Sequence, residues 1–234
     1  MTVDHSAWDR MLAAHIVASP DGINRFSYGR VTAADKRTLK TYLAALEGAK
    51  VTVLKPGEQR AFWINLYNAL TIDVVLDHYP VKSIKDIAIG PGLFTSGPWG
   101  RPLVTVEGRK LSLDNIEHDI LRKVWRDPRV HYAVNCASIG CPNLMAKAFT
   151  GGDLDDMLTQ GARDYINHPR GARVGDGRLR LSQIYSWYRK DFGASEAELL
   201  RHLSVYAGPG LKKHLAGIDR IAGYDYDWSL NEVK

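Results

Sequence analysis

The segment over residues 58–78 constrains the fold most, because it is long, predicted to be helical and apolar on every side. A helix with apolar residues all round is buried, so we expect it to lie at the centre of the core. Pro80 ends it, since proline cannot continue a helix. Asn65, Asn68 and Asp73 interrupt the apolar run, which is too short and too polar to predict a membrane span.

The remaining segments predict an α+β protein. We expect helices near residues 5–17, 32–46, 112–125, 153–168 and 181–192, hairpins at 103–113 and 172–182, and a buried strand at 129–136. A Gly/Pro-rich loop at 83–103 is typical of segments that carry function. Helices and hairpins segregate instead of alternating as βαβ units, so we predict one domain over residues 1–234 with a small antiparallel sheet. The N-terminal helices (5–47) and the C-terminal tail (207–234) should pack on it.

Composition and charge exclude some classes of protein. The chain has 234 residues, is 45% hydrophobic and 24% charged, and carries a net charge of +5 that is spread along the sequence. These values are typical of a soluble domain, and no clustered basic patch or module predicts nucleic-acid binding. The N-terminus lacks a basic head followed by an apolar run, so it predicts no signal peptide. We expect a periplasmic or secreted protein if a leader lies outside this sequence, and a cytoplasmic one otherwise.

Cys136 and Cys141 are the only cysteines, and their segment alone permits a nucleophile, a disulfide or half of a metal site. Structural zinc sites usually have repeated, closer pairs, so we expect neither a metal nor another cofactor. A disulfide is geometrically allowed and would favour an exported protein. As a nucleophile we prefer Cys136, which follows the predicted strand among small residues, over Cys141, which Pro142 biases toward an extended conformation.

The helix over residues 112–125, which Ser112 caps, offers a base for this thiol. Glu117 falls within its apolar stripe, where a carboxylate needs a cation or a donor, and His118 lies at the border of that stripe. His118 is thus a candidate base and Glu117 a candidate partner, although both residues also fit structural roles. His131 competes, but its odd spacing from Cys136 would place the two side chains on opposite faces of a strand.

Four further polar residues are candidates for substrate binding. Asn65 and Asn68 share one flank of the predicted core helix, where buried amides must find partners. They would either hold the cysteine loop in shape or donate a hydrogen bond to a substrate carbonyl. Asn135 and Ser138, beside Cys136, have the same two interpretations.

Five segments together resemble a known family. They are "FWINLYNALTIDVVLDHYP", "SIKDI", "LSLDNIEHDILR", "DPRVHYAVNCASIGCPNL" and "LSQIYSWYRKDFG", in this order. The chain resembles, over about residues 8–206, the domain-of-unknown-function family 547 of bacteria and plants. The family is similar to papain-like cysteine hydrolases of the bleomycin-hydrolase kind.

The resemblance implies a papain-like architecture around a central helix and a Cys-His-Glu set that acts on small thiol peptides such as glutathione. Transferred to this sequence, it implies Cys136 as nucleophile, His118 as general base and acid, and Glu117 as orienting group. We therefore expect a cofactor-free hydrolase that cleaves an amide bond through a Cys136 thioester. The alternative is a non-enzymatic binding or scaffold domain with structural or disulfide-linked cysteines; the oligomeric state is left open.

Overall fold

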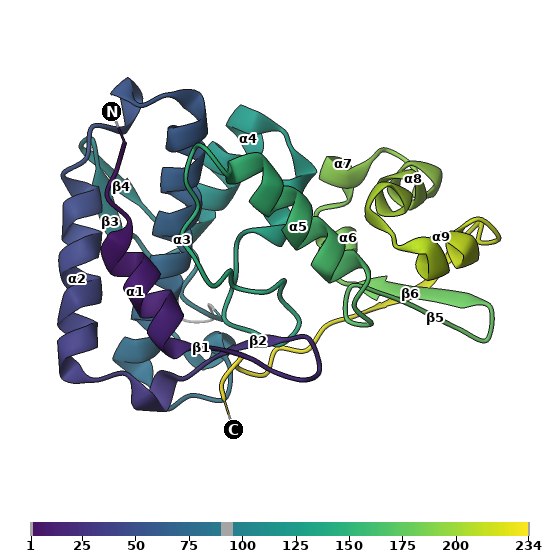
Figure 1. Ribbon diagram of the computed structural model, residues 1–234, viewed down its shortest axis with the longest axis horizontal. Helices are drawn as coiled ribbons and strands as arrows, with labels where there is room; N and C mark the ends of the chain where they lie inside the picture. The colour runs from purple at the N-terminus through teal and green to yellow at the C-terminus, as the bar shows by residue number, and fades with distance from the viewer. Residues whose placement is uncertain (1, 90–95, 234) are drawn as a thin grey trace.

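The computed structural model describes residues 2–89 and 96–233 and shows a mixed α+β architecture (Figure 1). Residues 90–95 of the predicted Gly/Pro-rich loop lie outside the described residues. The α-helices are α1 (Ser6–His15), α2 (Ala33–Glu47), α3 (Pro56–His78), α4 (Arg122–Trp125), α5 (Leu154–Ile166), α6 (Ile184–Trp187), α7 (Arg189–Phe192), α8 (Glu196–Tyr206) and α9 (Pro209–Leu215). Single turns of 3₁₀-helix are η1 (Tyr28–Arg30), η2 (Val51–Val53) and η3 (Ile84–Asp86); η5 (Pro128–Tyr132) is longer, and η4 (Asn115–Leu121) is a π-helix.

The strands form small sheets at the edges of the helical body. They are β1 (Ile16–Ala18), β2 (Asn24–Phe26), β3 (Val104–Val106), β4 (Arg109–Leu111), β5 (Ala172–Gly175), β6 (Arg178–Ser182) and β7 (Ile221–Asp225). β1–β2 and β3–β4 are antiparallel pairs, whereas β7 adds in parallel to the β5–β6 hairpin. Both predicted hairpins are confirmed, and the turn of each contains a non-glycine residue with positive φ followed by glycine, as tight hairpin turns favour.

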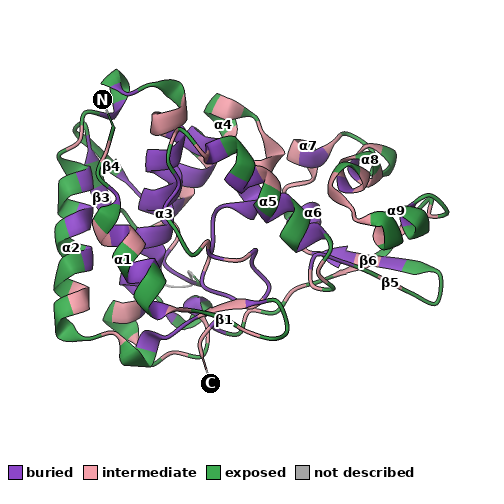
Figure 2. Cartoon of the chain, in the orientation of Figure 1, coloured by how far each residue is buried: buried purple, intermediate pink, exposed green. Residues whose placement is uncertain are grey.

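Helix α3 is the central core element, as the sequence predicts. Almost every residue from Arg60 to Val75 is buried, and Figure 2 shows the helix buried along most of its length. Its polar core residues Asn65 and Asn68 are 0% and 2% exposed. Within the described residues, none of the helices combines the length and apolarity that crossing a membrane requires.

The predicted strand at 129–136 is wrong. Residues 128–132 form the 3₁₀-helix η5, because Pro128 begins it and the side chain of Asp127 accepts a hydrogen bond from Arg129 N. Beyond it, the Asn68 side chain supplies the hydrogen bonds that a neighbouring strand would give. Its Nδ2 donates to Ala133 O, and its Oδ1 accepts from Asn135 N. The argument from strand spacing against His131 therefore no longer holds.

Three other local predictions need correction. The helix expected near 5–17 ends at His15 and is followed by the β1–β2 hairpin, residues 181–192 form two short helices instead of one, and the tail contains β7. The small sheet is mixed, because β7 runs parallel to β6. These pairings join segments that are distant in sequence, which local patterns do not report.

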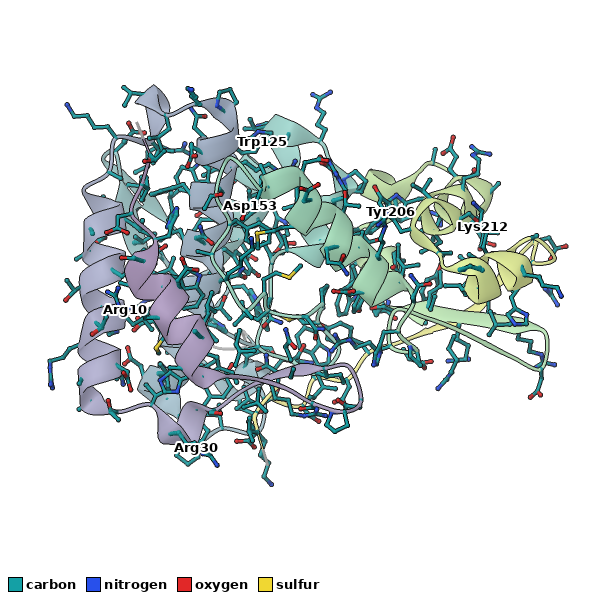
Figure 3. All side chains as sticks on the ribbon, viewed as in Figure 1. Arg10, Arg30, Trp125, Asp153, Tyr206 and Lys212 are labelled. Atoms are coloured by element: carbon teal, nitrogen blue, oxygen red, sulfur yellow. A yellow bond between two sulfur atoms is a disulfide. The ribbon has the colours of Figure 1, made fainter. Side chains whose placement is uncertain are left out.

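Two buried clusters organise the packing. The larger one surrounds α3, and a smaller one lies among α5, α6, α8 and the β5–β6 hairpin. Charged side chains cover the outside: Arg10 and Arg30 are exposed at one end and Lys212 at the other (Figure 3). The basic charge is therefore spread over the surface, as it is in the sequence.

Candidate active site

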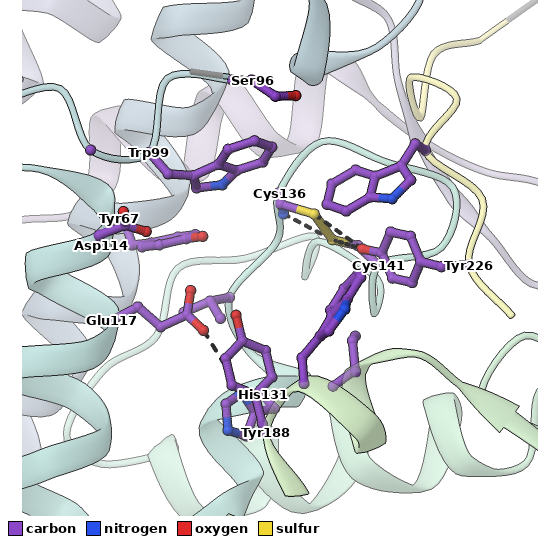
Figure 4. Close-up of a pocket in the computed structure, with 16 residues that line it drawn as sticks. Tyr67, Ser96, Trp99, Asp114, Glu117, His131, Cys136, Cys141, Tyr188 and Tyr226 are labelled. Atoms are coloured by element: carbon purple, nitrogen blue, oxygen red, sulfur yellow. Dashed lines mark hydrogen bonds and ion pairs between the residues drawn. A yellow bond between two sulfur atoms is a disulfide. The ribbon is translucent and has the colours of Figure 1, made fainter. Parts of the chain in front are cut away.

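The main pocket, of about 540 Å³, brings together residues from most of the chain (Figure 4). Its aromatic wall consists of Tyr67, Trp99, Trp187, Tyr188, Tyr226 and Trp228. Its acidic and imidazole groups are Asp114, Glu117 and His131, and Ser96 and both cysteines also line it. Of the predicted catalytic residues, the structure thus brings Cys136 and Glu117 to one pocket.

The helical segment that contains the π-helix η4 carries the two acidic lining residues. Ser112 and Asn115 bond each other reciprocally at the start of this helical segment, which confirms the predicted cap. A π-helix is rare, and where it occurs it frequently marks a functional site. Here Asp114 precedes it, and Glu117, only 5% exposed, lies within it. Burial raises the pKa of Asp114, and the nearby Glu117 carboxylate adds to this shift.

His131 is the imidazole that lines the described pocket, and two groups hold it. Its ring stacks on Tyr188 with centroids 4.2 Å apart, and its Nε2 lies 2.7 Å from Oδ2 of Asp191. Burial favours neutral Asp191, but hydrogen bonds from His131 and Arg122 outweigh this effect and hold its pKa below the usual range. An ionised carboxylate only accepts, so Nε2 of His131 carries a proton and Nδ1 is the nitrogen free to accept one.

Glu117 lies between two histidines. Its Oε1 is 3.9 Å from Nδ1 of His131 and 4.0 Å from Nδ1 of His118. The same nitrogen of His118 lies 3.0 Å from Nη1 of Arg122, and the side chain is 38% exposed. His118 is not among the described lining residues. Its catalytic role stays a prediction.

The two cysteines form a disulfide with Cα atoms 6.3 Å apart. Cys136 is half-buried, whereas Cys141 is 3% exposed. The hydroxyl of Tyr226 lies 3.1 Å from both sulfur atoms and 2.9 Å from the hydroxyl of Ser138, which is itself 3.3 Å from Cys136 Sγ. Burial raises the pKa of Tyr226, so its phenol remains a neutral O–H donor beside the sulfur atoms.

A sharp backbone turn holds Cys136 in this position. The next residue, Ala137, has φ = 59°, a left-handed conformation that is strained for a residue with a side chain. The side chain of Asn135 stabilises the turn, because its Oδ1 accepts from Ala137 N and its Nδ2 donates to Pro142 O. The carbonyl of Ala137 accepts from Asn231 N, which ties the turn to the C-terminal tail. Such strain concentrates at functional sites.

The predicted substrate-binding amides make contacts within the protein. Asn65 Oδ1 accepts from Phe149 N and its Nδ2 donates to Phe149 O, while Asn68 spans Ala133 and Asn135. None of Asn65, Asn68, Asn135 and Ser138 is among the lining residues in the described part of the chain. The contacts of Asn68 and Asn135 hold the cysteine loop in shape, whereas those of Asn65 hold the backbone of Phe149.

The sequence reasoning missed the aromatic wall. No local pattern assigns Trp187, Tyr188, Tyr226 or Trp228 to a site, although all four line the pocket. The tail reaches the pocket because Gly140 N donates to Asp227 O and Ile139 N to Ser229 O. The density of aromatic residues at 224–228 was the one local signal that could have indicated a binding surface.

Fold and site together define an α+β protein with an aromatic-walled pocket that holds a cysteine pair, a buried histidine and two carboxylates. The chain belongs to the family described as "Protein of unknown function, DUF547", whose model matches residues 51–166. The match contains Tyr67, Trp99, the acidic residues, His131 and both cysteines, while the rest of the aromatic wall lies beyond it. Searches of curated proteins and of solved structures gave no significant match.

Proposed function

We propose that this protein is a cysteine-dependent hydrolase that cleaves an amide bond of a small peptide, with Cys136 as its nucleophile. The observation that supports this most is the shared pocket, in which Figure 4 shows Cys136 across from Glu117 and His131. Two parts of this proposal rest on the family resemblance: the papain-like architecture and glutathione as the small peptide.

The resting disulfide must open before the reaction. Two equivalents of a small thiol reduce it, giving one molecule of the thiol's disulfide and the free thiols of Cys136 and Cys141. The hydroxyls of Tyr226 and Ser138, already within 3.1 and 3.3 Å of Cys136 Sγ, can donate to the thiolate and lower its pKa.

An imidazole first takes the proton of the Cys136 thiol. The thiolate then attacks the amide carbonyl, the C–N bond breaks, and the imidazolium gives that proton to the leaving amine. Water attacks the resulting thioester, releases the acid and regenerates the thiolate, while the imidazole takes up the proton. The geometry favours His131 for this imidazole, since it lines the pocket and Asp191 orients it. His118 is the candidate implied by the resemblance.

The test is hydrolysis of small peptides, measured by product formation, with protein kept in a thiol reductant. We expect Cys136→Ala to abolish activity and Cys141→Ala to retain it, because Cys141 serves only to cap the resting sulfur. His131→Ala and His118→Ala decide between the two histidines. Full activity of Cys136→Ala would refute the assignment of Cys136 as the nucleophile.

The disulfide also favours a second candidate, a non-enzymatic binding domain whose cysteines are structural. In that case the oxidised and reduced proteins should bind the same ligands, and no peptide should be hydrolysed in either state. Slow reaction of Cys136 with a thiol-directed electrophile near pH 7, no faster than free cysteine, would favour this candidate over the hydrolase.

A further inference from the structure

We propose that the pocket recognises a positively charged group, so that its ligand is a small amide carrying a protonated amine or an ammonium. Only the step from ligand to substrate rests on the proposed function, because the binding preference itself needs no catalysis. It is based on the charge of the lining, the aromatic wall and the position of the neighbouring cations.

The lining carries negative charge without a matching positive one. Asp114 and Glu117 line the pocket, and no lysine or arginine is among its described lining residues. His131 is bound to Asp191 through Nε2, so it gives Glu117 only a contact at 3.9 Å. Tyr67 and Tyr188, which also line the pocket, hydrogen-bond the Glu117 carboxylate, which is only 5% exposed. These phenols carry no charge, so a cationic ligand would supply the counter-charge.

The wall opposite these carboxylates presents aromatic rings. Trp228 lies 5.7 Å from Trp99, 5.5 Å from Trp187 and 4.7 Å from Tyr226, centroid to centroid. Because the Tyr226 hydroxyl contacts both sulfur atoms, these rings form one cluster beside the cysteines. The faces of such rings attract cations, most strongly where water is excluded. Rings and carboxylates around one cavity are the combination that recognises ammonium groups.

Two side chains already show that these rings accept cations. Lys85 Nζ lies 5.2 Å from the centre of the Trp228 ring, and the Arg122 guanidinium lies 4.7 Å from that of Tyr188. Neither residue lines the described cavity, and Arg122 is bound by Asp191. The cavity therefore keeps its acidic character.

The test measures binding to the oxidised wild-type protein through the fluorescence of the pocket tryptophans. The probes are Nα-acetyl-lysine amide and its neutral counterpart Nα-acetyl-norleucine amide. We expect the lysine probe to bind at least tenfold more tightly than the norleucine probe. Equal binding of the two probes would overturn the inference without any variant being needed.

Charge-removing variants then locate the preference. Glu117→Gln and Asp114→Asn should each weaken binding of the lysine probe about fivefold or more and leave binding of the norleucine probe unchanged. Asp119→Asn is the matched control on the same helix, because its side chain is exposed and bonds Asn115 instead of lining the pocket. Selective binding of the lysine probe with no peptide hydrolysis would contradict only the proposed function. Hydrolysis of neutral peptides without a preference for cations would contradict only this inference.

Discussion

The hydroxyl of Tyr226 lies 3.1 Å from Sγ of Cys136, although 90 residues separate the two in the chain. The contact exists because the tail pairs with the backbone of residues 137–140, which turns Tyr226 into the pocket. A phenol that stays protonated is a fixed hydrogen-bond donor. The Tyr226 hydroxyl therefore lies where it can donate a hydrogen bond to a Cys136 thiolate.

Replacing Tyr226 by Phe should raise the pKa of the Cys136 thiol, because the thiolate loses a donor. We expect a rise of about 1 unit, or about 1.4 kcal/mol. The measurement is the pH dependence of Cys136 alkylation in a Cys141→Ser background, where it is the sole thiol. Tyr224→Phe, two residues away and outside the lining, is the control and should leave the profile unchanged. An unchanged profile in Tyr226→Phe would contradict the role of the phenol.

Asn68→Ala should destabilise the protein and loosen the segment before Cys136. The variant leaves the buried carbonyl of Ala133 and N–H of Asn135 without partners, at a cost of about 2–4 kcal/mol. Asn65→Ala, one helical turn away, is a matched control. It should lower the unfolding free energy by a similar amount, but it removes the hydrogen bonds to the backbone of Phe149 instead. Urea unfolding measures the first effect, and amide hydrogen exchange at 133–136 the second. Equal exchange in both variants would rule out a specific role of Asn68.

Gly140→Ala should separate the tail from the cysteine loop. A Cβ at this position would lie 2.9 Å from both N and O of Asp227, so the backbone has to shift. We expect a loss of about 1–3 kcal/mol in unfolding free energy, as for other overpacked sites. The same variant should slow alkylation of reduced Cys136, because Tyr226 moves with the tail. Gly175→Ala has nothing within 4 Å of its Cβ and is the control; comparable destabilisation of both proteins would contradict the packing argument.

Asp127→Asn should lower stability in a pH-dependent manner. Burial raises the pKa of Asp127, but hydrogen bonds from Arg129 and Arg60 outweigh it and lower the pKa to about 2. Because the folded pKa lies below the unfolded value, this carboxylate stabilises the fold above about pH 4, and the contribution is lost as the pH falls toward 2.

At pH 7 we expect the substitution to cost about 1–2 kcal/mol, after allowance for partial exposure of the pair. Urea unfolding at several pH values checks this, and the difference from wild type should shrink below pH 4. The exposed Asp119→Asn variant should change stability little throughout. A deficit that persists undiminished at pH 2 would mean that lost packing, not charge, causes it.

Local patterns predicted the elements whose hydrogen bonds close within themselves. Helix α3 followed from its all-round apolarity and from Pro80 beyond its end, and both hairpins followed from alternating residues around short turns. The burial of Glu117 beside a half-exposed His118 also followed from position on a helix. These features depend on residues a few positions apart, so the sequence alone determined them.

Tertiary structure decided what surrounds Cys136. The segment before it resembles a strand, yet Asn68, on a different helix, supplies its backbone hydrogen bonds, so no neighbouring strand is needed. His131 lies on the 3₁₀-helix η5 before this segment and lines the pocket, and pairing with the tail adds Tyr226 and Trp228. Such contacts join residues 65 or more positions apart. Their energies depend on which groups meet in the folded chain, and a local pattern carries no record of that.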